Sequence, residues 1–205
     1  MTRPTIPTLV ALCAVTSLLA LPAAAQTGGC ATAANLSSGI NLDFSDGITE
    51  VYRRLSPGIA SVTGLEGAEQ IYRLEIAQGT HLLDYIEVSG GQPVEASHQV
   101  YDYGMAPQSL PVPTPGQRFN PVVQVTASDG VRTEAQAQAY VETDPIVLGA
   151  CTYRAIEAVI AYDTPDNYIE SITYLPDLEI GFLHWSQTDE GRAVDHEVVG
   201  IRTGK

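Results

Sequence analysis

The chain has 205 residues and a formal net charge of −14, with 24 acidic residues against 10 lysines and arginines. A chain this acidic repels nucleic acid and anionic membrane surfaces, so neither is an expected partner. Charged residues make up only 17% of the sequence and apolar residues 44%, which argues against disorder and allows a sizeable core.

Residues 1–25 have the layout of a secretory signal peptide, with an early arginine, an apolar run and a small-residue end. Ala23 and Ala25 satisfy the small-residue rule, so we expect cleavage between Ala25 and Gln26. The apolar run is shorter than the roughly 20 residues of a membrane span, and no later segment qualifies as one. The sequence therefore predicts export, to the periplasm or the exterior of a bacterium.

Cys13 leaves with the signal peptide, so the mature chain keeps two cysteines, Cys30 and Cys151. In an oxidising compartment the simplest arrangement is one disulfide between them. An alternative is a lipoprotein acylated at Cys30, but Thr27 stands where lipoprotein signals usually carry leucine. A reactive thiol or a thiolate metal site is a further alternative, although neither cysteine has a C-x-x-C partner or an adjacent histidine.

Two acidic segments share the form D-x-x-D-[GN]-x-x-E, residues 43–50 and 163–170, and raise the question of calcium binding. A calcium loop of the helical type needs oxygen donors at alternate positions around a central glycine, and neither segment has them. The Ser-Asp-Gly of the first segment recurs at 128–130 without the carboxylates. In the second, Pro165 suits a central turn position and Asn167 tolerates the left-handed site that follows. We therefore predict turns.

Most of the mature chain has the pattern of β-strands. We predict an all-β fold over residues 26–205, either a curled antiparallel sheet or a two-layer β-sandwich, with few or no helices. The expected strands, besides the hairpin described next, are 70–77, 81–88, 96–103, 152–162, 168–175, 179–186 and 193–201.

The clearest strand is 131–141, where small or apolar residues alternate with polar ones over eleven positions. We expect its Val/Thr/Ala face to lie in the core. Pairing that face with Val123 and Val125 of the preceding strand places Val125 opposite Thr133. This register selects a three-residue loop, 128–130, with its glycine in the left-handed conformation.

The segment 105–121 contains five prolines and can be neither a helix nor a central strand. It either links two domains or connects strands within one sheet.

The region from this segment onward resembles a layout found in secreted and periplasmic bacterial all-β proteins of unassigned function, over about residues 110–201. The resemblance implies a curled antiparallel sheet and carries no catalytic residues. Cys151 departs from the layout, which usually has a hydroxyl residue there. The matching residues are Leu110, Pro111, Pro115, Gly116, Gly149, Cys151, Tyr153, Tyr174, Pro176 and Leu178.

A competing resemblance concerns the hairpin, which is similar to the last two strands of immunoglobulin-like adhesion domains. It implies a sandwich over 48–142 and a separate β-unit over 143–205. The expected disulfide favours a single unit, because it would tie the mature N-terminus to the C-terminal part.

The chain has no G-x-S-x-G, H-E-x-x-H, Walker or dinucleotide-binding motif, so we predict no catalytic residue, no metal and no cofactor. One pair of histidines is a weak metal candidate. If the hairpin at Glu190-Gly191 has a three-residue loop, His184 lies opposite His196, and two imidazoles could begin a zinc or copper site. With a two-residue loop, His184 faces Glu197 instead.

Aromatic residues of the second half are the more suggestive feature. Tyr153, Tyr162, Tyr174 and Trp185 could line a groove on a curled sheet, although an ordinary core is the alternative. We predict an exported, non-catalytic binding or envelope-associated β-domain, whose partner is a small apolar ligand or another envelope protein. The alternatives are a secreted hydrolase with scattered site residues and an adhesion-type interaction module.

Overall fold

The computed structural model of the chain describes residues 29–204, without the side chains of 192–194. The predicted signal peptide and its cleavage site between Ala25 and Gln26 lie outside the described residues. The all-β prediction is confirmed, because the described residues form strands and three short 3₁₀ segments, Ala33–Ser37, Glu95–Ser97 and Pro107–Ser109. In this part of the chain no helix is long and apolar enough to cross a membrane.

The strands, in chain order, are β1 (Ile40–Phe44), β2 (Ile48–Ser56), β3 (Ile59–Glu66), β4 (Glu69–Ala77), β5 (His81–Ser89), β6 (Gln92–Pro93), β7 (Gln99–Asp102), β8 (Arg118–Phe119), β9 (Val122–Ala127), β10 (Gly130–Leu148), β11 (Cys151–Tyr162), β12 (Ile169–Leu175), β13 (Ile180–Thr188), β14 (Gly191–Asp195) and β15 (Val198–Thr203).

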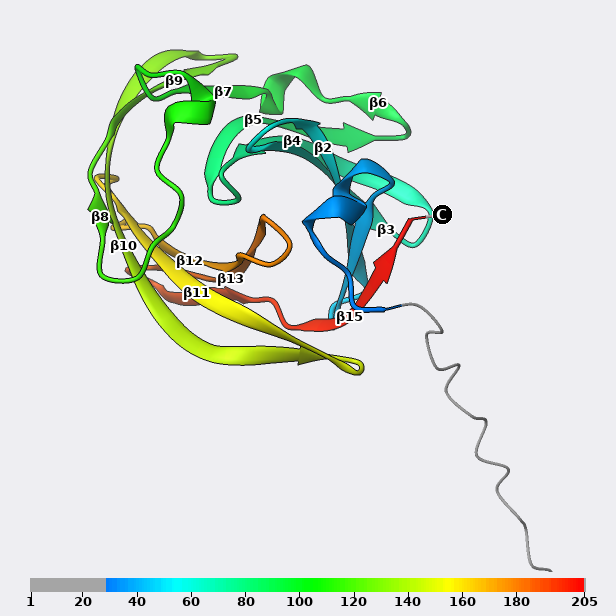
Figure 1. The fold of residues 1–205 in the computed structure, drawn as a ribbon. Helices are drawn as coiled ribbons and strands as arrows, with labels where there is room; N and C mark the ends of the chain where they lie inside the picture. The colour runs from blue at the N-terminus through cyan, green and yellow to red at the C-terminus, as the bar shows by residue number, and fades with distance from the viewer. Residues whose placement is uncertain (1–28, 205) are drawn as a thin grey trace, which may run out of the picture.

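All of them belong to one antiparallel sheet with the order β14-β13-β12-β11-β10-β9-β7-β5-β4-β3-β2-β1-β15, to which β6 and β8 are added beside β5 and β10. The sheet is strongly curled, with β2–β5 on one side and β10–β13 on the other (Figure 1). Its two ends, β14 and β15, are consecutive strands separated by His196 and Glu197. The two ends of the sheet are therefore neighbours in the sequence. Within the described residues, no backbone hydrogen bonds pair β14 with β15, so the sheet is not closed.

Several predicted strands match the structure, namely β4, β5, β11, β12 and β13, each within two residues at either end. The predicted strand 193–201 is wrong as a single element: it breaks at His196, after which β15 pairs with β1. The strands β1, β2 and β3 were not among those expected. The strand β2 was not expected because Glu50 and Tyr52 lie on the same face, so apolar and polar residues do not alternate regularly along it.

The hairpin of β9 and β10 forms, but the predicted register is wrong. Ala127 pairs with Gly130, which leaves a two-residue loop, and Val125 lies opposite Arg132. Gly130 still has a positive φ, of 135°. Val123 and Val125 of β9 are fully buried, and the residues opposite them on the same face of the hairpin are polar.

The buried face of β10 is therefore the opposite of the predicted one. Glu134, Gln136 and Gln138 are buried, whereas Ala135 and Ala137 face solvent. Alanine gains little from burial, since its side chain has a small apolar area. The polar side chains bond to one another along the strand, so their burial leaves few groups unsatisfied.

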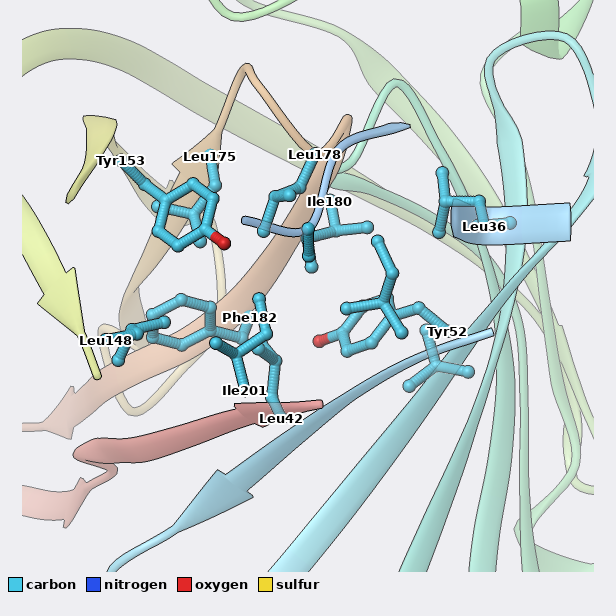
Figure 2. Packing of buried hydrophobic residues seen from close by; sticks show 14 of the residues in the cluster. Leu36, Leu42, Tyr52, Leu148, Tyr153, Leu175, Leu178, Ile180, Phe182 and Ile201 are labelled. Carbon is cyan, nitrogen blue, oxygen red and sulfur yellow. The ribbon is translucent and has the colours of Figure 1, made fainter. Parts of the chain in front are cut away.

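The largest hydrophobic cluster lies between β1–β3 on one side and the ends of β10–β13 on the other (Figure 2). Its fully buried members include Tyr52, Leu175 and Ile180. The predicted disulfide between Cys30 and Cys151 is present and packs against this cluster. It fixes the first described residues to the start of β11, and it occupies the sulfur that acylation of Cys30 would need.

The proline-rich segment 105–121 connects β7 to β9, and these two strands pair with each other. The segment is therefore a connection within one sheet. His81 fastens it to β5, because the Nε2–H of this fully buried histidine donates to the carbonyl oxygen of Pro111 (2.9 Å). The next long strand, β10, runs without interruption from Gly130 to Leu148.

Both acidic segments contain the predicted turns. In the first, the N–H of Gly47 donates to the carbonyl oxygen of Phe44 (3.1 Å). In the second, the N–H of Asn167 donates to the carbonyl oxygen of Thr164 (3.0 Å), and Asn167 is left-handed with a φ of 48°.

Candidate functional site

The inside of the curled sheet contains a cavity of about 500 Å³. Strands from both sides of the curl contribute to its wall, from β2–β5 and from β10–β13. This volume is within the range of small-molecule sites, about 300–1,000 Å³. Most of the wall is apolar or aromatic. Its tyrosines are Tyr52, Tyr85, Tyr101, Tyr103, Tyr162 and Tyr168, and its aliphatic residues include Val62, Leu74, Ile76, Leu82, Ile160 and Ile172.

One side of the cavity is closed by the β4–β5 turn, which reaches across to β13. The turn passes so near to Gly181 that a Cβ atom there would lie 2.2 Å from the carbonyl oxygen of Gly79. Thr80, at the end of the turn, lines the cavity and is only 3% exposed. Its hydroxyl has no hydrogen-bond partner among the described residues. The oxygen itself is enclosed by the surrounding protein.

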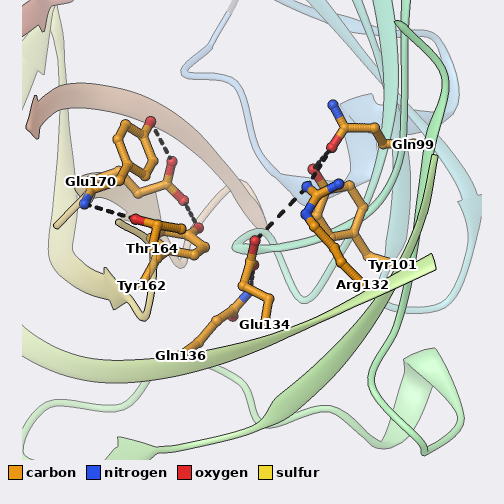
Figure 3. Close-up of polar contacts among 9 residues, drawn as sticks. Gln99, Tyr101, Arg132, Glu134, Gln136, Tyr162, Thr164 and Glu170 are labelled. Carbon is orange, nitrogen blue, oxygen red and sulfur yellow. Dashed lines mark hydrogen bonds and ion pairs between the residues drawn. The ribbon is translucent and has the colours of Figure 1, made fainter. Parts of the chain in front are cut away.

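Glu170 brings a carboxyl group to the cavity wall from β12 (Figure 3). One carboxyl oxygen accepts a hydrogen bond from the hydroxyl of Tyr162, and the other accepts one from Tyr168 (3.2 Å). Burial among these rings removes water from the carboxyl group and raises the pKa of Glu170, although the two hydrogen bonds act in the opposite direction.

Glu50 forms a similar group on the other side of the curl. Its carboxyl oxygens accept hydrogen bonds from Tyr52 and from Tyr72 (2.6 Å). Burial again raises the pKa of the carboxyl. Glu50 also lines a second cavity of about 250 Å³ that extends towards Phe44 and His196. The two cavities adjoin, since Glu50 is in the wall of both.

Glu134 ends a chain of side-chain hydrogen bonds along the inner face of β10. The hydroxyl of Tyr140 donates to Oε1 of Gln138 (2.8 Å). The amide of Gln138 then donates to Oε1 of Gln136 (2.8 Å), whose amide donates to Oε1 of Glu134 (2.9 Å). A carboxylate can only accept, so every donor in the chain is directed towards Glu134. Successive hydrogen bonds of this kind polarise one another.

Arg132 is the single basic residue among those that line the larger cavity, and it lies where the wall meets solvent. Its side chain is 49% exposed. One guanidinium nitrogen donates to Oε1 of Gln99 (2.9 Å) and lies 4.0 Å from Oε2 of Glu134 (Figure 3). Asp166, in the turn of the second acidic segment, is also exposed and lines the cavity.

The structure brings one of the four predicted groove residues to the cavity, Tyr162. Tyr153 and Tyr174 are buried in hydrophobic clusters, at 2% and 4% exposure. Trp185 pairs with Ser171, on the face of the sheet opposite to the cavity, and its indole N–H donates to Oε1 of Glu157 (3.3 Å).

The sequence reasoning did not identify the three glutamates of the wall. Two of them have a signal in the sequence: Glu50-Val-Tyr52 and Tyr168-Ile-Glu170 each place a carboxyl and a phenol two positions apart. In a strand, such residues share one face and lie side by side.

His196 lies next to His184 across the hairpin, and its N–H donates to the carbonyl oxygen of His184 (2.7 Å). The loop has two residues, and a bulge between Ser186 and Gln187 shifts the register by one residue, so that His184 lies opposite His196. The ring of His196 contacts Asp46, with 3.0 Å between Nδ1 and Oδ2. Among the described residues, no three histidine, cysteine or acidic side chains form a group that could hold a metal ion.

Comparison of the chain with protein-family models, with curated proteins and with solved structures gave no match. The cavity is therefore the feature of the molecule that bears on its function.

Proposed function

We propose that this is an exported protein that binds a small organic molecule in the cavity of its curled sheet. The observation that carries the proposal is the cavity of about 500 Å³, with a wall that is mostly apolar and aromatic and has a few polar groups. This combination is typical of ligand sites, where apolar groups supply affinity and a few polar groups fix orientation.

The polar part of the wall supports the same function. Protein interiors are packed closely, and a large unfilled volume beside hydrogen-bonding groups is uncommon in a purely structural core. Glu134 and Glu170 line the cavity, and a molecule bound there would give their carboxyl groups a further partner. We therefore expect a ligand with an apolar body and at least one polar group.

Export is supported by the signal-like N-terminus and by the disulfide between Cys30 and Cys151, a bond typical of oxidising compartments. The proposal predicts that the exported chain begins at Gln26. N-terminal sequencing of the protein recovered from periplasm or medium checks this, and a first residue of acylated Cys30 would contradict it.

Binding can be tested with N-phenyl-1-naphthylamine, an uncharged aromatic probe whose fluorescence rises in apolar surroundings. We expect a saturable rise with the purified mature protein. The variant Leu74→Trp places a larger side chain in the cavity wall and should abolish the rise. Val141→Trp introduces the same side chain at a position that is 52% exposed on the outer face of β10, and it should leave binding unchanged.

Equal loss in both tryptophan variants, or binding that survives Leu74→Trp, would contradict a site in the cavity. Circular dichroism of each variant establishes that it is folded before binding is compared.

A further inference from the structure

The charge of the cavity wall is unbalanced. Four carboxyl groups line the larger cavity, those of Glu50, Glu134, Asp166 and Glu170, against the single guanidinium of Arg132. An acidic wall alone could be a consequence of the acidic composition of the chain. Three further features of the wall, however, point to a bound cation.

The first feature is the setting of Glu170. Its hydrogen-bond partners are two neutral phenols, Tyr162 and Tyr168, and no arginine or lysine of the described residues forms an ion pair with it. A carboxyl group removed from water without a cation is unfavourable in its charged form. A cationic ligand would supply the missing charge.

The second feature is the aromatic surface around this carboxyl. The rings of Tyr162 and Tyr168 are 5.3 Å apart between centroids and inclined at 45°. Tyr101 and Tyr103 also line the cavity, and burial raises the pKa of Tyr101 to about 12, so its ring stays neutral. The faces of neutral tyrosine rings attract ammonium groups within about 6 Å.

The third feature is the direction of the polar groups. The donor chain from Tyr140 through Gln138 and Gln136 ends on Glu134, so the hydrogen-bond donors along this face point at a carboxyl group. Arg132 lies at the solvent edge, bonded to Gln99 and 4.0 Å from one oxygen of Glu134, and the residues that line the cavity include no basic side chain beside Glu170.

We propose that the ligand is a small organic cation, an apolar or aromatic body carrying a protonated amine, with the amine held between Glu134, Glu170 and the tyrosine rings. This assignment rests on the proposed function, because it names the class of ligand for the same cavity. An organic anion would meet four carboxyl groups and one guanidinium, and a purely apolar molecule would leave the acidic charge of the wall unbalanced.

The test compares three probes with the same aromatic body by isothermal titration calorimetry at neutral pH: 2-(2-naphthyl)ethylamine, 2-(2-naphthyl)ethanol and 2-naphthylacetate. We expect the amine to bind roughly tenfold or more tighter than the alcohol, and the carboxylate to bind most weakly, since a hydrogen bond to a charged group contributes about 1.5–3 kcal/mol. An alcohol that binds as tightly as the amine would overturn the assignment.

Variants locate the effect. Glu170→Gln keeps the size of the side chain and should reduce amine affinity about tenfold or more, with the alcohol almost unaffected. Glu134→Gln serves as a second variant and should act in the same direction. The matched control is Glu157→Gln, which removes a carboxyl group from the opposite face of the sheet and should change neither affinity.

The outcomes separate this assignment from the proposed function. If N-phenyl-1-naphthylamine binds and Leu74→Trp removes it, while amine and alcohol bind alike, the cavity is a ligand site and the cation is wrong. If neither N-phenyl-1-naphthylamine nor any of the three naphthyl probes binds, both proposals are contradicted.

Discussion

Gly79 and Gly181 touch backbone to backbone at one side of the cavity: a Cβ atom on Gly181 would lie 2.2 Å from the carbonyl oxygen of Gly79. The carbonyl oxygen of Gly181 accepts a hydrogen bond from the hydroxyl of Tyr52 (3.1 Å). Strand β13 is thus held against the β4–β5 turn on one side and against β2 on another. This contact closes the cavity next to Thr80, and it joins the two sides of the curl.

Gly181→Ala should separate these elements, because the clash is with backbone and cannot be relieved by a side-chain rotation. Overpacking of this kind costs about 1–3 kcal/mol of unfolding free energy. Urea denaturation followed by circular dichroism measures the loss. Gly29→Ala is the control, since no atom lies within 4 Å of its added Cβ and its φ is not in the left-handed region. Equal midpoints for the two variants would refute the contact.

Gln138→Ala should destabilise the protein through the donor chain of β10. The substitution leaves the hydroxyl of Tyr140 and Oε1 of Gln136 without partners, and both residues are buried. Each unsatisfied buried group costs about 1–3 kcal/mol. Gln124→Ala, at an exposed position of the neighbouring strand β9, should change the unfolding free energy by less than about 0.5 kcal/mol. Thermal or urea unfolding of both variants distinguishes the two cases.

The same strand shows where sequence reasoning succeeds and where it fails. The alternation over 131–141 correctly predicts a strand, because a period of two is a property of the local backbone. It does not show which face is buried when one face is alanine and the other is glutamine and glutamate. That choice depends on partners such as Tyr140 and on strands far away in the chain, which the local pattern does not contain.

The candidate site was less predictable than the fold. Tyr162 was identified because an aromatic residue in a strand is visible from sequence. Trp185 was grouped with it, but the bulge of β13 opposite Ser171 and Ile172 shifts the register, and one residue of shift exchanges the two faces of a strand. The glutamates were not predicted, because the carboxyl–phenol spacing at Glu50 and Glu170 also occurs at the exposed Glu87 and Glu142, so it does not single out the buried pairs.

Removal of the disulfide should destabilise the fold without changing its class. Cys30 and Cys151 are 121 positions apart, and a loop of this length corresponds to about 4–5 kcal/mol in the chain-entropy model. The double variant Cys30→Ala with Cys151→Ala should lose up to this amount of unfolding free energy. A thiol titration of the unfolded, unreduced mature protein should find no free thiol. Two free thiols per chain would show that the bond does not form.

The raised pKa of Glu170 makes stability depend on pH, with a sign that can be worked out. In the unfolded chain the carboxyl titrates near its ordinary value of 4.5, whereas burial among Tyr162, Tyr168 and the nearby Glu134 raises the pKa in the folded state. Between these two values the folded state binds the proton and the unfolded state has released it. The unfolding free energy therefore falls as pH rises through this window, by up to about 1.4 kcal/mol per pH unit for one proton.

Glu170→Gln removes this titration. The variant should gain stability relative to the parent protein as pH rises from about 4 towards 7. Over this range, folding of the parent requires Glu170 either to take up a proton or to be buried as a charged carboxylate, and folding of the variant requires neither. Urea unfolding at several pH values measures the difference. Glu142→Gln, which removes an exposed carboxyl group from β10, is the control. A difference between Glu170→Gln and the parent that stays constant with pH, or that shrinks as pH rises, would contradict the setting of Glu170 on which the cationic ligand depends.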